Sequence, residues 1–179
     1  MLTATYSLVA ISAEQKNAQT ILRKLRQYIQ ACVKKLQEVD ISKLETMFNK
    51  LTQFDQYCHA RKVEVYLIPA IRGATHEVDS LLAELESMSA RAITILKSVQ
   101  DHLRQAWGQG VDKIQELYNA MEIYCDNLLT RLTREEQELL PILERLFSID
   151  EWFAIAAKFL SDDADQKNRR APPRLPAPI

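Results

Sequence analysis

The chain has 179 residues, of which 47% are hydrophobic and 26% are charged, and this composition is typical of one globular domain. Its net charge of −1 gives no electrostatic argument for binding nucleic acid or a membrane surface. The three cysteines, Cys32, Cys58 and Cys125, form no CxxC pair, which indicates reduced thiols in a cytoplasmic protein. We find no secretory signal and no apolar run of the roughly 18 residues that a membrane span needs.

Helix-breaking residues are scarce until the last eight positions. Glycine occurs only at residues 73, 108 and 110, and the only prolines before residue 172 are Pro69 and Pro141. Both residue types are unfavourable inside helices, so long helices are expected between them. Apolar residues at helical spacing predict helices over residues 13–37, 43–71, 76–107, 111–146 and, more briefly, 150–160. Because the connections are short, we expect an all-α fold, an antiparallel up-down-up-down four-helix bundle with a short fifth helix.

The end of the chain differs in character from the rest. It is basic and rich in proline, so we predict that residues 1–162 form the bundle and residues 163–179 a disordered tail. Pro173 and Pro176 have the PxxP spacing of segments that dock on aromatic grooves, although an unstructured end is the simpler interpretation. A protein partner is therefore expected on this tail or on the bundle surface, and homo-oligomers are compatible with the sequence.

One motif occurs twice, over residues 59–71 and residues 131–143. Each copy ends in two aliphatic residues, a proline and two further apolar positions. The first copy begins with His59 and has Val63 four residues later, whereas the second begins with Arg131 and has Glu135 at the matching place. A His and a Glu four residues apart share one face of a helix and can bind one metal ion in a bundle core. Each copy therefore keeps only one half of such a pair.

The two copies, together with the stretch from Leu143 to Trp152, resemble the hemerythrin-like or HHE domain family. The resemblance implies an antiparallel four-helix bundle whose core holds a non-heme di-iron centre. It also implies ligand positions on all four helices, and at these positions only His59 and Glu135 fit. The other implied positions hold Gln15, Val63, Leu85 and Arg131. Gln15 has a simpler interpretation as well, because Ser12 and Gln15 have the spacing of a helix-capping box.

The residues at the implied positions contradict the implied cofactor. Val63 and Leu85 offer no donor atom, and the permanent positive charge of Arg131 repels a cation. We hypothesise that Arg131 supplies the positive charge of the absent metal and pairs with Glu135, with Glu14 or Gln15 across the core. The competing interpretation is an ordinary surface pair between Arg131 and Glu135, one helical turn apart.

These residues favour a non-catalytic hemerythrin-like bundle without a di-iron site, acting as a binding or regulatory module with no cofactor. The alternative is a divergent metal protein for oxygen, nitric oxide or iron sensing or storage. It would use non-heme iron and these residues: His59 and Glu135, with Glu14, Glu64, Glu84 or Cys58. A third interpretation is an enzyme with a small-molecule pocket in the space left by the metal, but no set of catalytic residues supports it.

Overall fold

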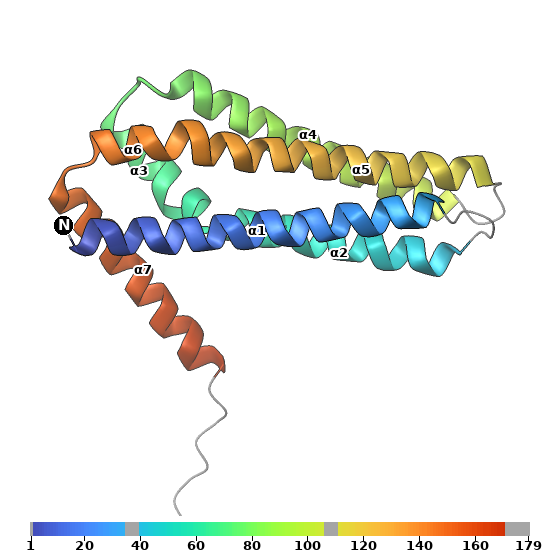
Figure 1. The fold of residues 1–179 in the computed structure, drawn as a ribbon, viewed down its shortest axis with the longest axis horizontal. Helices are drawn as coiled ribbons and strands as arrows, with labels where there is room; N and C mark the ends of the chain where they lie inside the picture. Colours follow the sequence, from blue (N-terminus) through green and yellow to red (C-terminus); the bar gives the residue numbers. More distant parts are fainter. Residues whose placement is uncertain (1, 35–39, 106–110, 171–179) are drawn as a thin grey trace, which may run out of the picture.

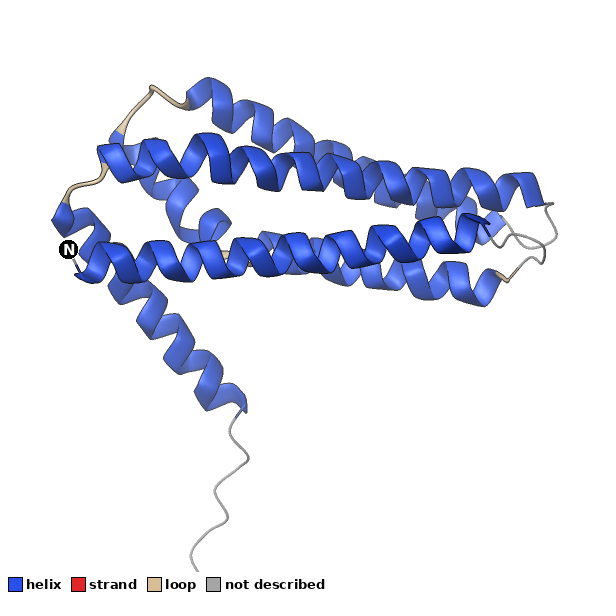
Figure 2. Cartoon of the chain, in the orientation of Figure 1, coloured by secondary structure: helices blue, strands red, loops and turns tan. Residues whose placement is uncertain are grey.

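The computed structural model describes residues 2–34, 40–105 and 111–170, and every element in these ranges is helical (Figure 2). The elements in chain order are α1 (Leu2–Lys34), α2 (Ile41–His59), the π-helical turn η1 (Val63–Leu67), α3 (Ile68–Ala74), α4 (Asp79–Gln105), α5 (Val111–Arg134), the π-helical turn η2 (Glu135–Leu139), α6 (Leu140–Leu146) and α7 (Ile149–Arg170). Helices α1, α2, α4 and α5 run alternately in opposite directions along one long axis (Figure 1). The predicted antiparallel four-helix bundle is therefore confirmed.

Both copies of the repeated motif contain a π-helical turn just before their proline. The N–H of Ile68 donates to the carbonyl of Val63, and the N–H of Leu140 donates to the carbonyl of Glu135, five residues back in each case. Proline has no N–H, and its ring crowds the carbonyl four residues earlier, so the turn widens by one residue. The two motifs therefore share a backbone geometry as well as a sequence.

The helix predicted over residues 43–71 is interrupted, unlike its counterpart over residues 111–146. Helix α2 ends at His59, and the chain bends at Ala60 and Arg61 before it resumes as η1. The second motif has no such bend, since η2 follows α5 directly. This difference changes which side chain of the first motif faces the core.

The first and last helices are longer than predicted. Helix α1 starts at Leu2, so Ser12 lies within a helix and the start predicted at residue 13 is wrong. Helix α7 continues to Arg170, past the boundary predicted at residue 163, because residues 161–170 contain neither glycine nor proline. Residues 171–179, including Pro173 and Pro176, lie outside the described residues.

The buried apolar side chains form two clusters along the bundle. The first joins one half of α1 to α2, α4 and α5, with residues such as Leu22, Leu51 and Met121. The second surrounds η1, η2 and α7, with residues such as Leu67 and Leu139. Polar side chains of α1, of the segment after α2 and of α5 with η2 are buried between the two apolar clusters, and these define the candidate site.

Candidate functional site

Five polar side chains meet in the interior: Gln15, Arg61, Glu64, Arg131 and Glu135, which we call the ion-pair cluster. Gln15, Arg61, Arg131 and Glu135 are buried, and only Glu64 reaches the edge of the interior, with 20% of its side chain exposed. Helix α1 supplies Gln15, the segment after α2 supplies Arg61 and Glu64, and α5 with η2 supplies Arg131 and Glu135. Elements that are distant in sequence thus converge on one buried set of charges.

Arg61 and Glu135 form the centre of the cluster. The Nη2 atom of Arg61 donates to Oε1 of Glu135, and its Nη1 atom lies 2.9 Å from Oε2, so the two planar groups meet side by side. Arg61 Nη1 also donates to Oε1 of Gln15 at 2.5 Å, and Arg61 Nε donates to the carbonyl of Cys58 at 3.4 Å. The bend at Ala60 and Arg61 places this guanidinium inside the bundle.

Arg131 approaches the same carboxylate from the other side. Its Nη1 atom lies 3.2 Å from Oε1 of Glu135, its Nη2 atom pairs with Oε1 of Glu64, and its Nε donates to the carbonyl of Leu85 at 3.1 Å. Oε1 of Glu135 is therefore shared by two guanidinium groups. The buried pairing of Arg131 with Glu135 agrees with our hypothesis and disagrees with the interpretation of a surface pair.

Gln15 completes the shell around Glu135. Its Nε2 atom donates to Oε2 of Glu135 at 2.9 Å and to the carbonyl of Leu132 at 2.8 Å. Gln15 thus bridges the carboxylate and Arg61, and its interpretation as a capping residue is wrong because α1 begins well before it. Glu14 takes no part in the pairing with Arg131 and instead accepts the backbone N–H of Lys62 at 2.8 Å.

The formal charges of the cluster cancel, with two guanidinium groups and the carboxylates of Glu64 and Glu135. Burial by itself would raise the pKa of Glu135, but the charges of Arg61 and Arg131 and the hydrogen bonds from Arg61 and Gln15 hold it below its ordinary value. Burial would likewise lower the pKa of Arg61, and the charge and hydrogen bonds of Glu135 reverse that effect. Both partners are therefore ionised at neutral pH.

The structure separates the two residues that fit the family positions. Glu135 is fully buried, whereas 53% of the His59 side chain is exposed. The Nε2 atom of His59 lies 3.5 Å from Oδ2 of Asp55. Val63 and Leu85 are buried among apolar side chains. The bend after α2 explains the position of His59, because it turns Arg61 inward in place of the histidine.

The other residues considered as metal ligands are also dispersed. Glu84 is largely exposed and pairs with Arg134 at 2.6 Å, and Glu64 pairs with Arg131. Cys58 is buried, and burial raises the pKa of its thiol to about 12. Among the described residues, no group of three or more His, Cys, Asp or Glu side chains is arranged to hold a metal ion.

A dinuclear cation site does not fit the side chains present in the interior. Iron in such a site needs several imidazole and carboxylate donors. Here both oxygens of Glu135 already accept hydrogen bonds, and two guanidinium groups adjoin them. A cation placed beside Glu135 would have to displace Arg61 or Arg131 and leave a buried guanidinium unpaired.

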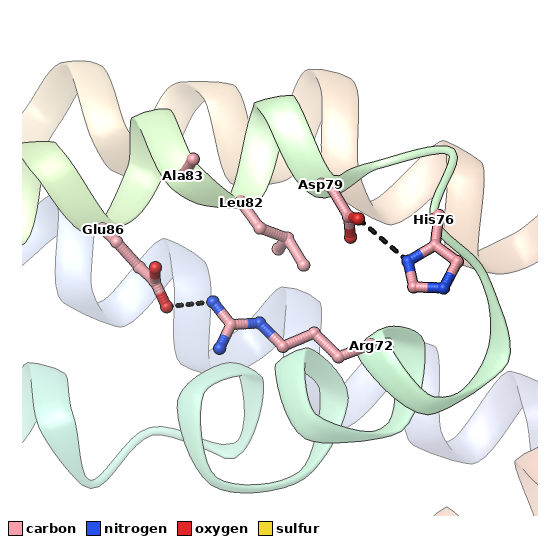
Figure 3. Close-up of a pocket in the computed structure, with 6 residues that line it drawn as sticks. All are labelled: Arg72, His76, Asp79, Leu82, Ala83 and Glu86. Atoms are coloured by element: carbon pink, nitrogen blue, oxygen red, sulfur yellow. Dashed lines mark hydrogen bonds and ion pairs between the residues drawn. The ribbon is translucent and has the colours of Figure 1, made fainter.

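A surface hollow of about 340 Å³ lies between α3 and α4, apart from the ion-pair cluster (Figure 3). Its polar side chains are already paired with one another: Arg72 with Glu86, and His76 Nδ1 with Asp79 Oδ2 at 2.9 Å. Leu82 and Ala83 complete the lining. All four polar side chains that line this hollow are therefore paired within it.

The fold and the interior define a helical bundle with a polar centre on facing helices, at the place where such bundles build their functional sites. The family model described as the hemerythrin HHE cation binding domain matches residues 10–143, and the chain belongs to this family. The stretch from Leu143 to Trp152, which carries part of the resemblance to the family, lies almost entirely beyond the matched residues. No curated protein and no solved structure matches the chain. None of the described helices combines the length and apolarity that crossing a bilayer requires.

Proposed function

We propose that this protein is a hemerythrin-family bundle that works without a di-iron centre, as a non-catalytic binding or regulatory module. The observation that carries the proposal is the sharing of Glu135 between Arg61 and Arg131. Two fixed positive charges compensate the buried carboxylate, so the interior needs no cation for its charge balance.

Retention of the scaffold supports the same proposal. Both motifs keep their proline, their π-helical turn and the buried leucines Leu67 and Leu139. Of the implied ligand positions, Gln15, Arg131 and Glu135 hold side chains that belong to the ion-pair cluster. Val63 and Leu85 at two further positions are buried among apolar side chains. The bundle scaffold is thus retained without the ligands of a metal site. We therefore propose that the module binds its partner through the outer surface of the bundle.

The exposed face of α7 is the best candidate for that surface. Ile149, Phe153 and Leu160 are exposed and lie within one stripe of the helix, while Trp152 and Phe159 on the adjoining face are buried. Contiguous exposed apolar side chains are typical of interaction sites. This face belongs to the helix that follows the family-matched residues.

The second candidate function is metal binding of the kind that the family description names, and its support is the family match itself. Thermal unfolding separates the two. A metal that binds only the folded protein, present at 100 times its dissociation constant, would raise the melting temperature by about 5–10 °C. We expect equal melting temperatures with a chelator and with excess Fe²⁺ under anaerobic conditions. A rise with Fe²⁺ that the chelator abolishes would favour the second candidate.

A further inference from the structure

Side chains of the segment from Arg61 to Tyr66 make contacts in two directions, toward the ion-pair cluster and toward α7. Arg61 and Glu64 point into the ion-pair cluster, where they bind Glu135 and Arg131. Lys62 and Tyr66, from the same short stretch, bind the outer helix α7. One irregular segment therefore contacts both the buried charges and the last helix of the described structure.

The contacts to α7 are specific. Lys62 Nζ lies 3.1 Å from Oδ1 of Asp163 and 5.5 Å from the centre of the Phe159 ring. The hydroxyl of Tyr66 donates to the carboxylate of Asp162, and its ring packs on Phe159 at 5.6 Å between centroids. These contacts hold α7 at its buried face, beside Trp152, Ile155 and Phe159 of the second apolar cluster.

Helix α7 lies beyond the residues that the family model matches. The family match ends at residue 143, and α7 follows after Phe147 and Ser148. A capping box starts α7, since Ser148 N donates to Glu151 Oε2 at 2.7 Å and Glu151 N donates to Ser148 Oγ at 3.3 Å. Helix α7 packs on α1 and then runs away from the bundle axis (Figure 1).

We propose that α7 is a releasable arm and that its docking is coupled to the ion-pair cluster through residues 61–66. This segment is irregular, because it contains the bend at Ala60 and Arg61 and the start of the π-helical turn η1 between α2 and α3. The Lys62 N–H donates to the carboxylate of Glu14, which is next to Gln15 in α1. A shift of Lys62 would therefore also displace groups beside the ion-pair cluster. Undocking of α7 removes the outer supports of the segment and uncovers the apolar side chains beneath the helix. Because coupling between two sites is reciprocal, loosening the ion-pair cluster in turn favours undocking of α7.

Hydrogen exchange of the full chain tests this coupling in both directions. In the first direction, Glu135→Gln weakens the cluster, and we expect the amides of residues 152–160 in α7 to exchange at least about 5-fold faster. The matched control is Glu86→Gln, which removes an exposed ion pair with Arg72. It should leave exchange in α7 unchanged.

In the second direction, the outer supports are removed at partly exposed positions. The double variant Tyr66→Phe with Asp163→Asn keeps the buried charges, so the fold is retained even if Glu135→Gln fails to fold. We expect faster exchange of the α7 amides and also of the Lys62 amide, which Glu14 protects. Faster exchange in α7 with an unchanged Lys62 amide would overturn the coupling, as would unchanged α7 exchange in a folded Glu135→Gln variant.

Discussion

Glu135 and Arg61 meet through two parallel contacts of 2.9 Å in a place from which water is excluded. One partner comes from the bend after α2 and the other from the π-helical turn after α5. A pair of this geometry is strong only while both charges remain, because either charge alone would be buried without compensation.

Glu135→Gln removes the shared negative charge and leaves Arg61 and Arg131 facing each other in the interior. We expect the free energy of unfolding to fall by about 3–5 kcal/mol, the usual effect of breaking a buried pair. Chemical denaturation followed by circular dichroism measures it. The control is Glu138→Gln, which removes an exposed carboxylate that pairs with Arg134 and should leave the unfolding midpoint unchanged. An equal effect of the two substitutions would contradict a central role for Glu135.

Replacing the four buried members of the ion-pair cluster together should be tolerated better than replacing one of them alone. The variant that combines Gln15→Leu, Arg61→Met, Arg131→Met and Glu135→Leu joins the two apolar clusters into one core. Buried ion pairs replaced by apolar side chains of similar size are often neutral or more stable by about 1–4 kcal/mol. We expect Arg61→Met alone to be less stable than this combination, as measured by urea denaturation. The opposite order would show that the charges themselves stabilise the fold.

The pKa of Glu135 sets a pH dependence of known sign. Its pKa is held below 4.5 in the folded protein, so its contribution to stability is present above about pH 4.5 and is lost as the pH falls through the folded pKa. Burial raises the pKa of Glu14, and its contribution has the opposite sign, present below about pH 4.5 and lost as the pH rises. Glu135→Gln should flatten the loss of stability in acid, and Glu14→Gln should not. Unfolding free energies measured from about pH 3 to pH 7 test both.

Two adjacent aromatic residues of α7 should respond differently to truncation. Trp152 is buried against Phe147, whereas 61% of Phe153 is exposed. We expect Trp152→Ala to lower the free energy of unfolding by about 3–5 kcal/mol and Phe153→Ala to change it little. Urea denaturation of the two variants compares them directly. Similar losses would mean that α7 packs with its other face inward.

The sequence was sufficient to predict the bundle, because apolar spacing and the scarcity of glycine and proline apply to every helix. It was also sufficient to place Arg131 beside Glu135, since the two positions lie one helical turn apart in an unbroken helix. Helix ends were less predictable, as the capping spacing of Ser12 and Gln15 occurs here inside α1.

Arg61 was missed because the helix through the first motif was expected to be continuous. The buried stripe of α2 carries the signal that could have found it. Its members are spaced alternately three and four residues apart, and the next step of three reaches residue 61: Leu44, Met47, Leu51, Phe54, Cys58. His59 lies off this stripe, and the bend that exposes it contains no glycine or proline from which it could be predicted.

The central claim is that Arg61 and Arg131 take the place of a metal, and metal analysis tests it most directly. The full chain is purified without chelator, incubated anaerobically with Fe²⁺, exposed to air and freed of unbound iron. Iron content and the optical spectrum are then measured on the same sample. Our account predicts far less than one iron per chain and no charge-transfer band. About two iron per chain with such a band would contradict it, because a dinuclear site would then form despite the buried guanidinium groups.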